Sequence, residues 1–157
     1  MKIYTDGATS NNGYDDAVGG WAYAIITDDE QHPIRVDCGR IENATNNICE
    51  LTAIIKACNA ATNIGGHFII YSDSAYCINC YKQKWYKKWQ QNGWLNSKKE
   101  SVANRELWEQ LIPFFENSLY EFEKVKGHDT NSKNQNSYWN NYVDKLAVAA
   151  KENKLNG

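Results

Sequence analysis

The hydrophobic pattern of this chain changes its period near residue 45, and this change limits the folds that the chain can adopt. Before that point, residues 2–6, 20–26 and 33–42 read as strands separated by polar or glycine-bearing turns, which predicts an antiparallel meander. After it, apolar residues recur on one helical stripe, made up of Ile48, Leu51, Ile54, Ile55 and Cys58. We expect Asn46 or Asn47 to cap the start of this helix.

Strand and helix patterns alternate over the rest of the chain. Residues 68–71 form a near-continuous apolar run, typical of a strand in parallel pairing that is buried on both faces, and residues 119–125 alternate as in a half-exposed strand. Helices are predicted from Ser74 onward, over 101–115 and over 138–152. The order β-β-β-α-β-α-α-β-α predicts one mixed α/β sheet with helices on both faces.

The chain has 157 residues, enough for one domain with a substantial core, and we expect a single domain over 1–157. A net charge of −2 excludes a globally basic nucleic-acid binder, so any such binding needs a local basic patch. Residues 81–99 hold six Lys, three Trp and no acidic residue, which predicts a local basic patch that contacts nucleic acid. The alternative is a solvated helix whose Trp85 and Trp89, spaced i, i+4, face the core.

The five Cys residues are an odd number and follow no signal-peptide pattern, which indicates reduced thiols in the cytoplasm. Cys77 and Cys80 have the spacing of half a zinc site, but no second Cys or His pair completes it. No apolar run approaches membrane-spanning length, so no membrane partner is expected.

Four acidic residues stand in separate motifs: Asp6, Glu50, Asp73 and Asp144. We expect Asp6 and Asp73 to close two parallel strands, which places both at the carboxyl edge where open α/β sheets bind ligands. Glu50 is expected in the first turn of the first helix, and Asp144 lies beside the apolar stripe of the last helix. Carboxylate oxygens suit Mg²⁺, and two such ions can hydrolyse a phosphodiester.

Each carboxylate also has a purely structural interpretation. Asp6-Gly7 is a common turn pair, Asn47-x-x-Glu50 fits a capping box, and Asp73 could cap the helix that follows it. Asp144 with Lys145 could belong to a solvated helix face. The metal interpretation is favoured because the residues around all four acids also match one family.

The chain resembles the type 1 ribonucleases H in five ordered motifs, from about residue 2 to 152. These are Thr5-Asp6-Gly7, Thr45 to Leu51, Asp73-Ser74, Val125-Lys126-Gly127-His128 and Asp144-Lys145-Leu146-Ala147. The resemblance implies a five-stranded mixed sheet, with three antiparallel strands and then two parallel ones. It also implies a monomeric endonuclease that cleaves the RNA strand of RNA–DNA hybrids with two Mg²⁺ ions, or Mn²⁺ in their place, and leaves 5′-phosphate and 3′-hydroxyl ends.

The resemblance also assigns roles to individual residues. The metal ligands are Asp6, Glu50, Asp73 and Asp144, and His128 assists proton transfer or product departure. The RNA strand is contacted by Asn12, Asn46 and Glu50, which suits the 2′-hydroxyl group. The segment 81–99 resembles the basic protrusion of the family. The resemblance assigns contacts with the DNA strand to Thr45, Asn104, Lys82, Lys84, Trp85, Lys87, Lys88, Trp89 and Trp94.

Three departures from the family pattern concern the substrate contacts, in two cases, and the turnover rate, in the third. Ala75 stands where bacterial members often carry Gln, and Asn43 stands where some carry Arg. The segment Asp129 to Tyr138 is longer than in bacterial members, which predicts altered turnover.

Three other interpretations remain open from the residues. An integrase-like nuclease would place its last catalytic acid as Glu on a late helix, whereas this chain has Glu50 early and Asp144 last. A non-catalytic hybrid-binding module, or a ribonuclease H domain from a reverse transcriptase, would share the fold. A redox or zinc protein would need a fuller set of metal-spaced Cys residues.

Overall fold

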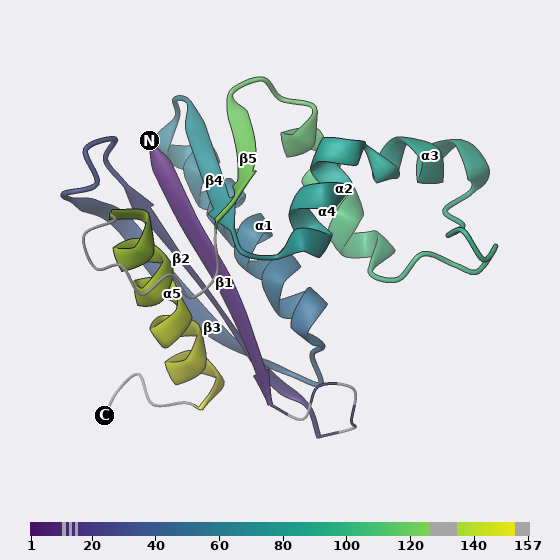
Figure 1. The fold of residues 1–157 in the computed structure, drawn as a ribbon, viewed down its shortest axis with the longest axis horizontal. Coiled ribbons are helices and arrows are strands. Elements are labelled where there is room, and N and C mark those ends of the chain that lie inside the picture. The colour runs from purple at the N-terminus through teal and green to yellow at the C-terminus, as the bar shows by residue number, and fades with distance from the viewer. Residues whose placement is uncertain (11, 13, 15, 126–134, 153–157) are drawn as a thin grey trace.

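Five strands form one mixed sheet in this computed structural model, which describes residues 1–10, 12, 14, 16–125 and 135–152 (Figure 1). The strands are β1 (Lys2–Ser10), β2 (Val18–Ile26), β3 (Pro33–Glu42), β4 (Phe68–Ser72) and β5 (Tyr120–Lys124). Their order across the sheet is β3-β2-β1-β4-β5. The first three pair antiparallel, while β4 pairs parallel with both β1 and β5. The predicted sheet is confirmed.

Helices cover both faces of the sheet. They are α1 (Asn46–Ile64), α2 (Ala75–Gln83), α3 (Trp85–Asn92), α4 (Arg105–Phe115) and α5 (Gln135–Lys151). In Figure 1, α5 crosses one face of the sheet and α1 lies behind the other. Helices α1, α2 and α4 pack on the face that carries Ile3, and α5 packs on the face that carries Tyr4. Adjacent residues of β1 therefore serve two separate cores, as the two-residue period of a strand requires.

The first strand is longer than its sequence predicts. It runs to Ser10 because β2 pairs with it along its whole length, from Lys2 opposite Ile26 to Ser10 opposite Val18. Its parallel pairing with β4 reaches only Tyr4. The expectation that Asp6 closes the strand is therefore wrong: Asp6 lies in the middle of β1, just past the point where β4 ends.

The start of α1 also differs from the prediction. Thr45 is the capping residue, and its Oγ1 accepts a hydrogen bond from Ile48 N at 3.2 Å, so neither Asn46 nor Asn47 is the cap. With the helix beginning at Asn46, Glu50 lies in the second turn rather than the first. The capping-box interpretation of Asn47 and Glu50 is wrong as well, because Glu50 is too far from the cap to serve it.

The later helices follow the prediction apart from their boundaries. Helix α4 begins at Arg105, not at residue 101, and α5 begins at Gln135, before the predicted start at 138. The expected apolar stripe of α5 is buried against the sheet at Trp139, Val143, Ala147 and Ala150, with Leu146 partly buried beside it. None of the helices in the described part of the chain is both long and apolar enough to cross a membrane.

Candidate metal centre

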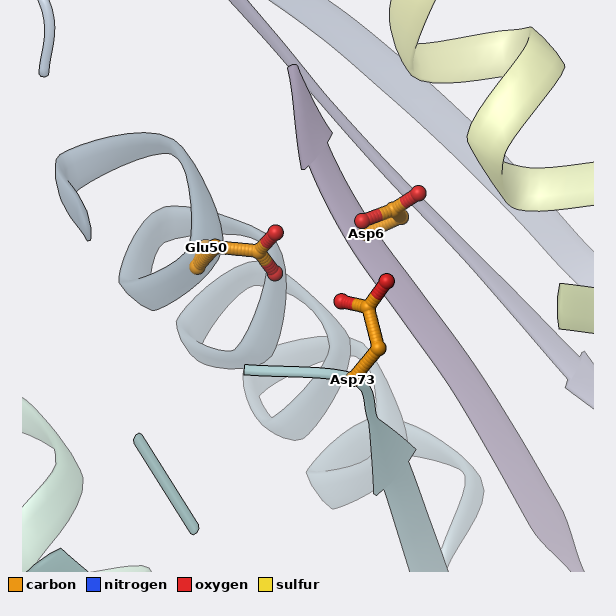
Figure 2. Close-up of side chains that lie close together, drawn as sticks. All are labelled: Asp6, Glu50 and Asp73. Atoms are coloured by element: carbon orange, nitrogen blue, oxygen red, sulfur yellow. The ribbon is translucent and has the colours of Figure 1, made fainter. Parts of the chain in front are cut away.

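Three carboxylates meet at the edge of the sheet where β4 ends. Asp6, Glu50 and Asp73 each offer one oxygen, and these oxygens lie within 4.8 Å of one another. Figure 2 shows the three carboxylates turned toward one another from β1, α1 and the residue after β4. Asp6 and Glu50 are buried, and Asp73 is half-buried. Residues far apart in the sequence thus form one acidic cluster.

Gly7 allows the strand that carries Asp6 to lie against the helix that carries Glu50. A Cβ atom at Gly7 would lie 2.6 Å from Glu50 N and 2.7 Å from the carbonyl carbon of Cys49. Contacts this short to helix backbone cannot be relieved by a side-chain rotation, so any other residue would push α1 away from β1. The Asp-Gly pair is therefore not a turn: the Asp supplies a carboxylate, and the Gly supplies the space that brings Glu50 to it.

Two polar contacts hold the turn that carries Asp73. Ser72 Oγ accepts a hydrogen bond from Ser74 N at 3.1 Å, and Ser74 Oγ accepts one from Cys77 N at 3.2 Å. Ser74 is therefore the cap of α2, and the interpretation of Asp73 as a helix cap is wrong. Asp73 is left to face the cluster.

The fourth predicted acid, Asp144, reaches the same place from α5. It lines a groove of about 430 Å³ together with Asp6, Glu50 and Asp73, and it contacts Asp6 through a side-chain hydrogen bond. Gly20 of β2 makes this approach possible, because a Cβ there would lie 2.1 Å from Ala147 O and 2.7 Å from Lys151 N. The structure therefore brings three of the four predicted acids within 4.8 Å of one another and places Asp144 on the wall of the same groove, and the role of all four as metal ligands stays a prediction.

Burial and mutual repulsion make this cluster costly in its charged form. The pKa of Asp6 is raised by burial first, then by the charges of Glu50 and Asp73 and by hydrogen bonds to neighbouring carboxyls. The pKa of Glu50 is raised mainly by burial and then by Asp73, although hydrogen bonds from Asp6 and Gly7 N oppose this shift. A cation at the cluster would reverse both effects.

The donor set fits a hard divalent cation. All four groups present carboxylate oxygens, which Mg²⁺ and Mn²⁺ prefer. Glu50 Oε2 is buried and has no hydrogen-bond partner among the residues that the structure describes. A buried acceptor of this kind usually costs about 1–3 kcal/mol, and more when the group is charged, unless something binds it. This buried oxygen therefore fits a cation held by the cluster.

The residues predicted to contact the RNA strand lie beside the acidic cluster. Asn46 and Asn47 line the groove with Glu50. Asn12 accepts a hydrogen bond from Asn46 N at 3.0 Å through its Oδ1 atom. Asn12 thus also holds the first turn of α1, a structural task that sequence reasoning did not assign to it.

The two residues predicted to bind a DNA phosphate lie at helix starts. Thr45 caps α1, and Asn104 precedes α4 in a left-handed conformation with φ 64°. Asn104 Nδ2 donates a hydrogen bond to Tyr76 Oη at 3.5 Å, and Trp108 Nε1 donates to the same oxygen at 3.1 Å. Tyr76 lines the acidic groove, so Asn104 connects with that groove through one side chain.

The segment 81–99 divides its tryptophans and lysines between two environments. Trp89 packs against Trp85, Trp94 and Trp108 with ring centroids 6.4, 5.7 and 5.6 Å away, and Trp94 is buried. The core-facing interpretation is therefore confirmed for the tryptophans, although Trp85 and Trp89 also line an open groove with Lys88.

The lysines of this segment are exposed, but they are not equivalent. Lys84, Lys87 and Lys88 are exposed on and beside α3. Lys82 instead forms an ion pair with Glu123 of β5 at 2.8 Å. A contact with nucleic acid would have to compete with this pair, so we give Lys82 a smaller part in the basic surface.

His128 lies outside the described residues, as do Lys126, Gly127 and most of the segment from Asp129 to Tyr138. Its assigned role stays a prediction. Sequence reasoning named Gly7 in a motif but gave it only a turn role, and it missed the site residues Gly20 and Tyr76 altogether. Glycine inside a strand signals a close approach of backbone, which could have found Gly20. No sequence signal points to Tyr76.

Comparison with known proteins first defines the class. The solution structure of the PFV RNase H domain matches with a TM-score of 0.80 at 22% identity, covering 96% of this chain and 93% of that one. The crystal structure of LC9-RNase H1 matches with a TM-score of 0.76 at 23% identity, covering 98% and 72%. At these identities the likeness concerns the fold, and it confirms the predicted ribonuclease H-like α/β fold.

Sequence relatives then define the family. The RNase H family matches residues 1–152. The Ribonuclease H of Syntrophomonas wolfei is 42% identical over 145 residues, which cover 92% of this chain and 91% of the relative. That of Thermoanaerobacter pseudethanolicus is 40% identical over 148 residues, covering 94% and 87%. The chain belongs to the ribonuclease H family, and the predictions of that family and of an enzyme are confirmed.

Proposed function

We propose that this chain is an endoribonuclease that hydrolyses the RNA strand of RNA–DNA hybrids with two bound Mg²⁺ ions, or Mn²⁺ in their place. The observation that carries the proposal is the acidic cluster in an open groove, where Glu50 Oε2 is buried and finds no hydrogen-bond partner in the described part of the chain. Family membership supports the activity. Structures of the foamy viral protease-reverse transcriptase and of LC11-RNase H1 in complex with RNA/DNA hybrid share the fold, with TM-scores of 0.82 and 0.68.

The proposal assigns the four carboxylates as metal ligands. Asp6, Glu50, Asp73 and Asp144 would hold the cations, which supply an activated water and stabilise the leaving oxygen when bound. Cleavage on the 3′-oxygen side of the phosphate would leave 5′-phosphate and 3′-hydroxyl ends. The low accessibility of Asp6 and Glu50 excludes bulk water from one side of the centre and strengthens electrostatic interactions there.

The proposal assigns strand discrimination to the surroundings of the cluster. Asn46 lies at the groove, where its amide can donate to and accept from a 2′-hydroxyl, a group that DNA lacks. Thr45, Asn104 and the segment 81–99 would contact the DNA strand. A single catalytic domain over 1–157 with this basic protrusion stays part of the proposal, as do its monomeric state and cytoplasmic location.

The test is cleavage of a hybrid labelled on its RNA strand, run beside duplex DNA, duplex RNA and single-stranded RNA of the same sequence. We expect cutting of the hybrid alone, with Mg²⁺ or Mn²⁺, none with EDTA, and products that carry 5′-phosphate. Equal cutting of duplex DNA would favour an integrase-like nuclease. Tight binding of the hybrid without cleavage would favour a non-catalytic module.

If the exposed lysines of the segment 81–99 contact phosphates, the affinity for the hybrid should depend on salt concentration. Replacing Lys84, Lys87 and Lys88 together with Ala is expected to raise KM for the hybrid. Each phosphate contact contributes about 0.7–0.9 to the slope of log affinity against log salt, so the slope should fall by about 2 to 3. Hybrid binding measured across a series of salt concentrations checks this result.

Lys56→Ala is the control for the lysine substitution, because Lys56 is exposed on α1 over the Trp21 ring and outside the segment 81–99. It should leave the slope unchanged. An unchanged slope in the triple variant would remove the segment from the binding surface while leaving the metal centre untouched.

A further inference from the structure

The first turns of α1 pack on two glycines of the sheet, Gly7 and Gly19, which have no side chains. Gly7 of β1 faces the backbone of Cys49 and Glu50, as described above. Gly19 of β2 faces the side chain of Cys49, and a Cβ atom at Gly19 would lie 2.1 Å from Cys49 Sγ. The sulfur therefore occupies the space that a side chain at Gly19 would fill.

Cys49 is fully buried and immediately precedes Glu50. The amide of Gly20 donates a hydrogen bond to its sulfur, so two successive residues of β2 hold this side chain. Neighbouring residues of a helix point about 100° apart. Cys49 can therefore face β2 while Glu50 faces Asp6, and the position of one fixes the position of the other.

We infer that Cys49 is a positioning residue for the metal centre: its sulfur, seated on Gly19, sets the distance between α1 and the sheet and hence the spacing of the Glu50 and Asp6 carboxylates. This inference rests on the proposed role of those two carboxylates as ligands. It concerns the packing of the sulfur, and Cys49 itself contacts neither cation nor substrate.

Cys49 Sγ is packed so closely against Gly19 that no side-chain atom fits between them. Non-bonded heavy atoms in a protein core approach to about 3.5–4.0 Å, so a methyl group at Gly19 would force a displacement on the order of 1.5 Å. The same methyl group would lie 3.3 Å from Ala44 Cβ and 3.4 Å from Ala8 O, and small adjustments can accommodate both of these contacts. A close-packed interior transmits such a displacement instead of absorbing it. A shift of about 1 Å in a catalytic group can cost about 100-fold in rate.

The contact between Cys49 Sγ and Gly19 can be tested by substituting each residue alone and then both together. Gly19→Ala should weaken Mn²⁺ binding by about 10-fold or more and lower kcat more than KM, because the spacing of the ligands changes. Cys49→Ala should weaken binding by only a few-fold, because it leaves a space rather than a clash. The double variant Gly19→Ala/Cys49→Ala should bind Mn²⁺ more tightly than Gly19→Ala, because the new methyl group fills the space left by the sulfur.

Cys58→Ala is the matched control. Cys58 is also a fully buried cysteine of α1, but it lies two turns further on and away from Glu50. It should lose thermal stability to an extent similar to Cys49→Ala and keep the Mn²⁺ affinity and kcat of the parent. Mn²⁺ affinity is measured by calorimetry and paramagnetic resonance, and folding by circular dichroism.

A folded Gly19→Ala variant with parental Mn²⁺ affinity would overturn the inference, and so would strictly additive losses in the double variant. If Gly19→Ala does not fold, the double variant must fold and bind Mn²⁺; an unfolded double variant would mean that Cys49 is not the group with which the methyl collides. A failure of the proposed function would give another result. The parent protein would then show no saturable Mn²⁺ binding, or its Mn²⁺ binding would not be removed by the Asp6→Asn substitution.

Discussion

Asp6→Asn is expected to reduce kcat for hybrid cleavage by about 1000-fold or more, a loss of about 4 kcal/mol of transition-state stabilisation. Asp6 is the buried acid that contacts both Glu50 and Asp144 and faces Asp73, so it stands at the centre of the cluster. The amide has nearly the same shape as the carboxylate but lacks the charge that a divalent cation needs. Single-turnover cleavage of a labelled hybrid in saturating Mg²⁺ measures this loss.

Two controls show whether the loss of activity in Asp6→Asn comes from the metal centre or from unfolding. The variant should keep the circular dichroism of the parent. Asp37→Asn provides the control, since Asp37 is an exposed acid of the edge strand β3. That control should cleave at the parental rate. Substantial cleavage by Asp6→Asn, with affinity for Mn²⁺ retained, would reject the assignment of this carboxylate as a ligand.

Without divalent cation, the parent is expected to lose thermal stability as pH rises from about 4 toward 8. The pKa values of Asp6 and Glu50 are raised in the folded chain, whereas the unfolded chain has values of about 3.9 and 4.3. In this window the folded state holds protons that the unfolded state has released. Stability therefore falls as pH rises, in contrast to the usual behaviour of a salt-bridged acid.

Mg²⁺ should remove most of this decline, because it stabilises the deprotonated carboxylates and binds the folded state alone. Asp6→Asn should also flatten the decline, and at pH 8 in EDTA it should melt at least about 3 °C above the parent, since 1 kcal/mol corresponds to about 2–4 °C at this size. Melting curves across this pH range, with EDTA or Mg²⁺, give both results. A parent that is equally stable at pH 5 and pH 8 in EDTA, and whose pH profile Asp6→Asn leaves unchanged, would contradict the burial of these carboxyl groups in the folded chain.

The sheet and its two helical layers could be predicted because their hydrophobic periods are unambiguous. The apolar run 68–71 predicts a strand, which is confirmed, but not its burial on both faces, because Phe68 and Ile70 are fully buried whereas Ile69 and Tyr71 are half-buried. The stripe from Trp139 to Ala150 packs on the sheet as predicted. The end of β1 could not be predicted, because Ala8 and Ser10 have little strand preference of their own and Thr9 alone does not define a strand. They are extended because β2 pairs with them, and pairing partners are a property of the tertiary structure.

The convergence of the acidic residues could be predicted from their motifs, but the reason for it could not. Sequence patterns identify Asp6, Glu50 and Asp73, whereas the close approach depends on absent side chains at Gly7, Gly19 and Gly20. The need for a glycine at these positions can be recognised only in the folded structure, where the helix that packs against each glycine is known. The same applies to Lys82, which sequence alone groups with the other lysines and which the fold pairs with Glu123.

The acidic groups of the centre are spread over almost the entire length of the polypeptide, and the last of them arrives on α5, which rests on Gly20 near the start. If Asp144 completes the centre as proposed, a growing chain on the ribosome carries the first three acids well before it can cut anything. Catalytic competence would then appear only once the final helix has been synthesised and has folded back onto the second strand, so that partly made molecules would leave nearby RNA–DNA hybrids uncut.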